Sequence, residues 1–156
     1  MERSKYKDIF LVSTDTVPGL GGFVSPETLE ALYELKQRPL DKKMVIVVGS
    51  LEQAQGFAQW NEEANAFAIH KWPGANTIIV NDQGFRMPAC KAFQEFLIKN
   101  GPMYLTSANL SGQPASKTLE EAKAQFPMIQ NVIDFCEGTG TPSTIYNLDT
   151  RETIRR

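Results

Sequence analysis

One stretch near the start of the chain decides its fold: Ile9-Phe10-Leu11-Val12-Ser13-Thr14-Asp15-Thr16-Val17-Pro18-Gly19-Leu20-Gly21-Gly22. Its first four residues are apolar, and a short apolar run before a Gly/Pro-rich segment is typical of a strand covered on both faces. We interpret residues 13–22 as a loop, because their hydroxyls and glycines let a ligand approach the backbone closely. A plain connection between a strand and a helix explains the same residues equally well.

Outward from this stretch, helix and strand signals alternate along the chain. Ser25 and Pro26 predict the start of a helix that runs to Lys36, with its leucines on one face. The same signals predict further helices after Ser50, after Asn61, over 89–100 and after Thr118, and strands over 44–48, 77–80, 85–87, 103–105, 132–135 and 144–148. The turn at 81–84 indicates an antiparallel hairpin. We therefore expect an α/β fold with a mixed sheet and flanking helices.

Composition limits the function classes. The chain has 156 residues, 42% of them hydrophobic and 22% charged, as expected of one domain over residues 1–156. The net charge of -2 excludes a global basic excess for binding nucleic acid, so any RNA contact needs a local patch. The apolar segment after Asp8 is too short for a signal peptide or a membrane span, which predicts a cytoplasmic protein without a membrane partner.

The two cysteines, Cys90 and Cys136, lack the C-x-x-C spacing of zinc and redox motifs. We interpret both as small apolar core residues of a protein in a reducing compartment.

Two further segments carry groups suited to phosphate chemistry. Lys36-Gln37-Arg38-Pro39, with Lys42 beyond it, could clamp a triphosphate, although cations at a helix end also stabilise the helix dipole. The run Thr106-Ser107-Ala108-Asn109-Leu110-Ser111-Gly112 could form a nest of amides for phosphate or carboxylate oxygens, or a turn whose side chains bond their own backbone. Neither common nucleotide-binding glycine motif is present in the sequence.

Taken in order, these segments resemble the YrdC-type (TsaC) threonylcarbamoyl-AMP synthase family. Thr14 to Gly22 matches its T-x-T-V-x-G-L-G motif and Lys36 to Pro39 its K-x-R-P motif. The remaining matches are Trp72-Pro73-Gly74 with Thr77 to W-P-G-x-x-T, Phe85-Arg86-Met87-Pro88 to V-R-x-P, Thr106 to Gly112 to S-A-N-x-S-G, and Ser143-Thr144-Ile145 to S-T-[VI]. Six ordered matches are far more specific than any one of them.

The resemblance implies an open, twisted sheet of the YrdC type and the synthesis of threonylcarbamoyl-AMP and pyrophosphate from L-threonine, bicarbonate and ATP. A separate threonylcarbamoyl transferase complex would then modify the adenosine beside the anticodon of tRNA.

Roles for individual residues follow from the same resemblance. Lys36 and Arg38 would act in catalysis, and Lys42 with Mg²⁺ carried by ATP would complete the neutralisation of the triphosphate; no dedicated metal site is expected. Thr14 or Thr16, with Arg86, would hold threonine, Arg86 by a fork onto its carboxylate. The remaining expected substrate contacts are Thr106, Ser107, Asn109 and Ser143.

The sequence departs from the family pattern at Pro18, at Ala75-Asn76 and in the short connection from Val80 to Phe85. Two other functions remain open. One is carbamoyl adenylation, as in the related domain of hydrogenase-maturation proteins. The other is a tRNA or double-stranded RNA binding module that uses the same face without turnover.

Overall fold

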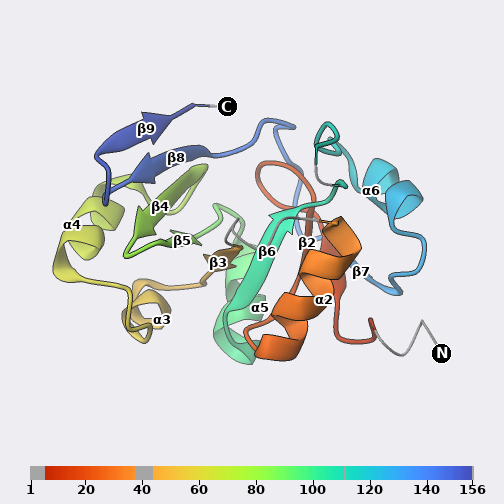
Figure 1. The fold of residues 1–156 in the computed structure, drawn as a ribbon, viewed down its shortest axis with the longest axis horizontal. Coiled ribbons are helices and arrows are strands. Elements are labelled where there is room, and N and C mark those ends of the chain that lie inside the picture. Colours follow the sequence, from red (N-terminus) through yellow and green to blue (C-terminus); the bar gives the residue numbers. More distant parts are fainter. Residues whose placement is uncertain (1–5, 38–43, 111, 156) are drawn as a thin grey trace.

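The computed structural model describes residues 6–37, 44–110 and 112–155. In this part of the chain, nine strands form one mixed sheet in the order β7-β1-β2-β6-β3-β5-β4-β8-β9 (Figure 1). The strands are β1 Phe10–Val12, β2 Gly19–Phe23, β3 Val45–Val47, β4 Asn76–Val80, β5 Gln83–Arg86, β6 Met103–Ser107, β7 Asn131–Ile133, β8 Thr144–Asn147 and β9 Glu152–Ile154. The predicted α/β fold, with its mixed sheet and flanking helices, is confirmed.

Four of the five described helices begin where the sequence predicts capping side chains. Ser25 Oγ accepts a hydrogen bond from Thr28 N at 3.1 Å, and Ser50, Asn61 and Thr118 cap their helices in the same way. Each such cap stabilises its helix by about 1 kcal/mol. The helices are α2 Pro26–Lys36, α3 Leu51–Gln55, α4 Glu62–Lys71, α5 Lys91–Asn100 and α6 Leu119–Gln125. Among the described residues, no helix is both long and apolar enough to cross a membrane.

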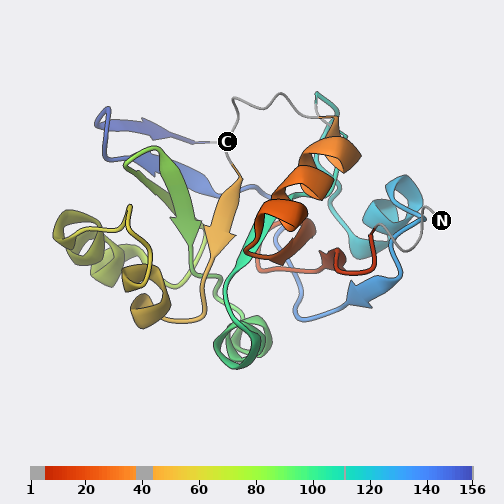
Figure 2. The same cartoon turned by 60° about the horizontal axis from the view of Figure 1, so that its bottom comes forward.

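Helices cover both faces of the sheet (Figure 2). Helices α2 and α6 pack on Leu11 and Leu20 in one core cluster. Helix α5 lies on the opposite face, where its Phe93 and Leu97 contact Val12 of β1. Helices α3 and α4 enclose a third cluster with strands β3, β4 and β5. The alternation of side chains along β1 therefore puts apolar residues into two cores, as the sequence predicts for a strand covered on both faces.

The prediction that residues 13–22 form a loop is wrong for its second half. Residues 19–23 form β2, which pairs antiparallel with β1 through Leu20 and Leu11 and with β6 through Gly21 and Leu105. A Cβ on Gly21 would lie 2.8 Å from Leu105 Cδ1 and closer still to the Tyr104 carbonyl oxygen. These glycines thus serve close packing of strands rather than a turn, and the loop shortens to residues 13–18, called below the 13–18 loop.

The predicted hairpin is confirmed, with a tighter turn than expected. Strands β4 and β5 pair antiparallel, and Asn81 and Asp82 connect them with φ values of 50° and 64°. The carboxylate of Asp149 accepts the backbone N–H groups of Asn81 and Asp82 at 2.8 and 2.7 Å. The short connection from Val80 to Phe85 is therefore a capped two-residue turn.

The interpretation of the cysteines as two separate core thiols is wrong. Cys90 and Cys136 form a disulfide across 46 residues of sequence, with Cα atoms 6.1 Å apart. Cys90 is buried, as expected of a core residue, but Cys136 lies in the partly exposed segment after β7. Pairing between cysteines so distant in sequence depends on the sheet topology, which residue spacing does not reveal. Strand β9 was also missed, because its exposed residues form no apolar run.

The third core cluster offers a test of the packing. Phe85 is fully buried, with its ring 5.2 Å from that of Trp60 and 5.6 Å from that of Phe57. Phe85→Ala should lower the free energy of unfolding by about 3 to 5 kcal/mol, measured by urea denaturation followed through tryptophan fluorescence. The control Ile98→Ala removes a side chain that is 57% exposed and should change it by less than about 0.5 kcal/mol. Equal losses in the two variants would contradict the assigned core.

Candidate functional site

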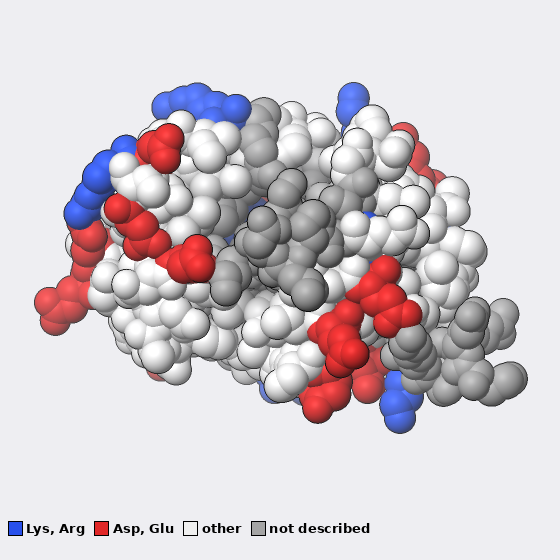
Figure 3. All heavy atoms as spheres, viewed as in Figure 1, with Lys and Arg blue, Asp and Glu red and all other residues white. Residues whose placement is uncertain are grey.

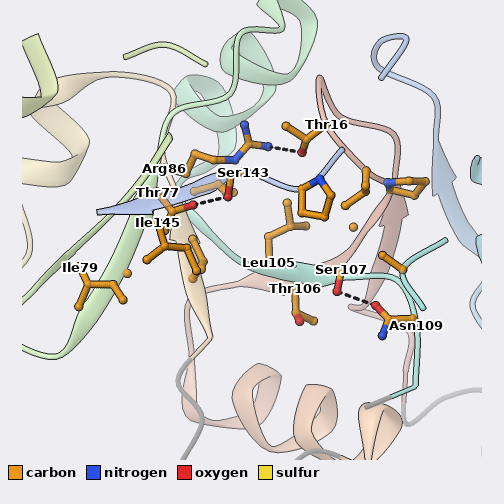
Figure 4. Close-up of a pocket in the computed structure, with 18 of the residues that line it drawn as sticks. Thr16, Thr77, Ile79, Arg86, Leu105, Thr106, Ser107, Asn109, Ser143 and Ile145 are labelled. Carbon is orange, nitrogen blue, oxygen red and sulfur yellow. Dashed lines mark hydrogen bonds between the residues drawn. The ribbon is translucent and has the colours of Figure 1, made fainter. Parts of the chain in front are cut away.

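The central strands form one wall of a cavity of about 610 Å³. Along the strands alternate residues line it, joined on β6 by Thr106, and this alternation places the cavity on one face of the sheet. They are Val45 and Val47 of β3, Thr77 and Ile79 of β4, Gly84 and Arg86 of β5, Leu105 and Ser107 of β6, and Ile145 and Asn147 of β8. The 13–18 loop closes one end of the cavity with Thr16, Val17 and Pro18. Polar groups therefore surround an apolar floor (Figure 4).

A buried ion pair fixes the 13–18 loop to β5. Arg86 Nη1 donates to Asp15 Oδ1 at 2.9 Å and to the Gly74 carbonyl oxygen at 2.9 Å. Arg86 Nη2 donates to Thr16 Oγ1 at 3.2 Å, the contact drawn in Figure 4. The second carboxylate oxygen of Asp15 accepts the Ala89 N–H at 2.9 Å. Arg86 thus orients Thr16 toward the cavity, and Asp15 orients Arg86.

The two threonines of the loop have different surroundings. Thr14 Oγ1 donates to the Val17 carbonyl at 2.7 Å and accepts the Thr16 N–H at 3.0 Å. Since that proton is committed, the 3.1 Å contact between the two hydroxyls is a donation from Thr16 to Thr14. Thr16 lines the cavity and Thr14 does not. Thr14 therefore shapes the loop, while Thr16 presents its remaining lone pair to the cavity.

At the end of β6, an amide and a lysine organise Ser107. Ser107 Oγ donates to Asn109 Oδ1 at 2.6 Å, and Asn109 Nδ2 donates to the carbonyls of Leu110 and Gln113 at 2.9 and 2.8 Å. Lys36, only 1% exposed, donates from Nζ to the Ser107 carbonyl at 2.6 Å. In this arrangement Asn109 uses both amide hydrogens within its own loop, so its part in the site is to orient Ser107.

Ser143 and Thr77 meet beside Arg86 in the cavity (Figure 4). Their hydroxyl oxygens are 2.7 Å apart and both side chains are buried (Figure 4). Ser143 precedes β8, which pairs in parallel with β4, so the pairing of these two strands brings together residues 66 positions apart. The W-P-G-x-x-T and S-T-[VI] motifs thus contribute neighbouring hydroxyls to one wall.

Most of the predicted site residues that the structure describes line this cavity. They are Thr16, Arg86, Thr106, Ser107, Asn109 and Ser143. Lys36 reaches it through Ser107, and Thr14 supports it from behind. Arg38 and Lys42, the other predicted phosphate-binding residues, lie outside the described residues.

Sequence reasoning missed the supports of the 13–18 loop. Asp15 belongs to the T-x-T-V motif, but the motif does not reveal its ion pair with Arg86. Nor does it reveal the contacts of segment 134–140: Thr139 N donates to the Asp15 carbonyl at 3.2 Å and Gly140 N to the Thr16 carbonyl at 2.9 Å. A Cβ on Gly138 would lie 2.7 Å from the Thr14 carbonyl oxygen and closer to that of Thr16. Only glycine allows this approach.

Comparison with known proteins gives matches along nearly the whole chain. A family model for Sua5, YciO and YrdC, described as "Telomere recombination", matches residues 5–156. Threonylcarbamoyl-AMP synthase of Chromohalobacter salexigens is 29% identical over 92% of this chain and 87% of that protein. Uncharacterized protein MG259 of Mycoplasma genitalium is 30% identical over 93% of this chain but only 31% of its own length. This chain therefore spans about a third of that relative.

A solved structure shares the fold. Sua5 of P. abyssi, determined in complex with L-threonine, superposes with a TM-score of 0.83 and 27% sequence identity. The match covers 96% of this chain and 49% of that chain, so the chain spans about half of that structure.

The Asp15–Arg86 ion pair should contribute strongly to stability, because its side chains are only 14% and 6% exposed. Asp15→Asn leaves the guanidinium without its charged partner and should lower the free energy of unfolding by about 3 kcal/mol or more. The matched control Glu63→Gln breaks the pair with Arg151, whose side chains are 50% and 66% exposed, and should cost under about 1 kcal/mol. Urea denaturation measures both; similar losses would show that the buried pair has no special role.

Proposed function

We propose, from the premise that the chain belongs to the Sua5/YciO/YrdC family, that it is an L-threonylcarbamoyladenylate synthase, a nucleotidyltransferase that makes threonylcarbamoyl-AMP. One observation carries the proposal. Four segments far apart in sequence, which contain Thr16, Arg86, Ser107 and Ser143, converge on a single cavity of about 610 Å³. A cavity of this size accepts a small amino acid together with a nucleotide.

The reaction needs two bonds to form. The threonine amine combines with bicarbonate, losing water, to give a carbamate. A carbamate oxygen then attacks the α-phosphorus of ATP, and the bond to the bridging oxygen of pyrophosphate breaks. Because the nucleophile comes from the substrate, the protein contributes chiefly by aligning the reactants and neutralising charge. A site rich in hydrogen-bonding groups, whose described residues form no catalytic triad, suits this chemistry.

At the phosphate end of the site, the structure describes one of the three proposed cations, Lys36. Its ammonium group lies beside Ser107 at the end of β6, with Nζ 3.4 Å from Ser107 Oγ. Arg38 and Lys42 are proposed to complete the clamp, on the strength of the motif. The described residues hold no group of three or more His, Cys, Asp or Glu side chains suited to a metal. Magnesium is therefore proposed to enter as part of the ATP substrate, held through phosphate oxygens and water.

At the other end of the site, Arg86 and Thr16 are proposed to bind threonine. The hydrogen bonds of Arg86 to Asp15, Gly74 and Thr16 use three of its five N–H donors. One hydrogen on Nη2 and that on Nε remain for a side-on fork to the threonine carboxylate. The lone pair of Thr16 that faces the cavity can accept from the substrate amine. The hydrogen bonds of Thr14 within the loop leave it no comparable group, so Thr16 is proposed as the threonine ligand of the pair.

The partners and location of the protein are proposed from the chemistry of the product. The product is a mixed anhydride that hydrolyses readily, so a transferase complex is proposed to pass the threonylcarbamoyl group to tRNA in the cytoplasm, where ATP, bicarbonate and threonine are available.

The alternative function, RNA binding without turnover, has less support. Helix α2 presents Glu27, Glu30 and Glu34 to solvent, and acidic groups gather over this helix in Figure 3. A phosphate backbone would be repelled there.

Pyrophosphate release tests the proposed activity. Purified protein with ATP, Mg²⁺ and bicarbonate should release pyrophosphate only when L-threonine is added, with serine a weaker substrate. Lys36→Met should reduce the rate by about 10²-fold or more, because it removes a cation from the developing charge. The control Lys71→Met, on α4 and outside the cavity, should leave the rate unchanged.

Two outcomes would count against the synthase. Folded protein without threonine-dependent release would exclude it. Retention of double-stranded RNA in the same preparation, with an affinity that falls steeply with salt, would favour the binding module instead.

The two loop threonines should respond differently to replacement by valine. Thr16→Val removes the proposed ligand and should raise the threonine KM by about tenfold, as expected for a lost hydrogen bond to a charged group. Thr14→Val breaks the bonds to Val17 and to Thr16 N, and should instead lower the free energy of unfolding by about 1 to 3 kcal/mol. Steady-state kinetics and urea denaturation of both variants separate the two effects, and an unchanged KM in Thr16→Val would refute the assignment.

A further inference from the structure

The disulfide joins two segments that each form hydrogen bonds with the 13–18 loop. Ala89, next to Cys90, donates its N–H to Asp15 Oδ2 at 2.9 Å. Cys136 donates its own N–H to Ser13 Oγ at 3.1 Å, and Ser13 Oγ donates to Asp134 Oδ1 at 2.7 Å. The bond between Cys90 and Cys136 therefore closes a covalent clasp around the loop that presents Thr16 to the cavity.

Of the two cysteines, Cys136 is the more exposed residue. Cys136 lines a second cavity, of about 660 Å³, together with Ser13, Thr14 and Thr16 of the loop. Cys90 is only 5% exposed. A small thiolate would therefore attack the sulfur of the partly exposed Cys136, and Cys90 would be the leaving group.

The surroundings of Cys90 favour that direction of attack. Cys90 is the N-cap residue of α5, a helix of ten residues. The N-terminus of a helix stabilises a neighbouring thiolate, and a stabilised thiolate leaves faster in disulfide exchange. The more exposed cysteine is thus the one attacked, and the leaving sulfur lies at a helix N-terminus.

We propose that Cys90 and Cys136 are a thiol–disulfide exchange site for low-molecular-weight thiols and disulfides, whose oxidation state sets how firmly the 13–18 loop binds threonine. The regulatory part rests on the proposed synthase function. A disulfide in a cytoplasmic protein is usually transient and serves catalysis or redox sensing. A reversible role fits this compartment better than a permanent staple.

The exchange needs no reactants other than small thiols and small disulfides. A small thiolate attacks Cys136 Sγ, the bond to Cys90 breaks, and Cys90 leaves as a thiolate that takes up a proton. A second small thiolate attacks the mixed disulfide, releasing the oxidised small molecule and the thiol of Cys136. Oxidation is the reverse, with a small disulfide such as oxidised glutathione as the oxidant.

Reduction should loosen the loop without unfolding the protein. The rings of Phe93 and Phe135 stack with centroids 4.7 Å apart, beside the two cysteines, and keep α5 against the segment after β7. The hydrogen bonds of the loop to segment 134–140 also remain possible. The covalent limit on how far the two segments can separate is what is lost.

The experiment compares oxidised and reduced forms of the whole chain, which has only two cysteines, so that a redox buffer acts on no other thiol. The protein is equilibrated with glutathione at graded ratios of reduced to oxidised form and then alkylated. Mass spectrometry counts its free thiols, and circular dichroism confirms that it stays folded. Hydrogen exchange is then measured over residues 13–18, and the threonine KM by pyrophosphate release. Cys136→Ser and Cys90→Ser serve as variants that cannot form the disulfide.

We expect a reversible change of two thiols across the glutathione series, faster exchange over 13–18 after reduction, and a threonine KM raised about fivefold, the lower end for coupled sites. Both serine variants should match the reduced protein and ignore the oxidant. Thiols that stay free under oxidised glutathione would overturn the proposal. So would a disulfide that forms without changing loop exchange.

The hydrogen-exchange result separates this proposal from the synthase assignment. If neither redox form releases pyrophosphate, the proposed activity has failed, and the mass and exchange measurements alone decide whether the cysteine pair controls the loop. If pyrophosphate is released with the same KM in both forms, the synthase stands and the regulation is refuted.

Discussion

The ion pair between Asp15 and Arg86 is the contact on which the site depends. It joins the 13–18 loop to β5, and the same guanidinium also binds the carbonyl of Gly74 and the hydroxyl of Thr16. Two motifs 71 residues apart thus become one rigid unit. Since a charged pair largely shielded from solvent is stable only with good geometry and additional hydrogen bonds, the surrounding donors and acceptors are constrained as well.

The remaining polar groups follow the same plan, in which one residue positions another. Asn109 orients Ser107, Thr14 orients Thr16, and Ser143 meets Thr77. Each pair stands at the end of a strand or beside one, where the sheet fixes its backbone. Pre-positioned donors of this kind stabilise developing charge without reorganising during the reaction. A reaction whose nucleophile is supplied by the substrate requires little else from the protein.

The sequence predicted the elements whose signals are local. Capping side chains at Ser25, Ser50, Asn61 and Thr118 located four helix starts, and apolar runs located β1 and β3. It failed where tertiary contacts override local preference. The glycines of β2 indicate a loop, yet they are there because Tyr104 and Leu105 of β6 leave no room for a Cβ.

For the site residues too, the sequence predicted what local motifs encode and missed what tertiary contacts decide. The ordered motifs identified the residues that line the cavity, but not which hydroxyl of Thr14 and Thr16 faces it, since that depends on proton directions within the loop. The pairing of Cys90 with Cys136 and the support given by Gly138 depend on contacts between segments that no local pattern encodes.

Mass spectrometry of the product tests the central claim most directly. The protein is incubated with ATP, Mg²⁺, L-threonine and ¹³C-labelled bicarbonate, and the masses of the nucleotide products are measured. The account predicts an adenylate that contains one threonine and one labelled carbon, formed together with pyrophosphate. Unlabelled AMP or ADP alone, or an adenylate that forms only when carbamoyl phosphate replaces threonine and bicarbonate, would contradict it.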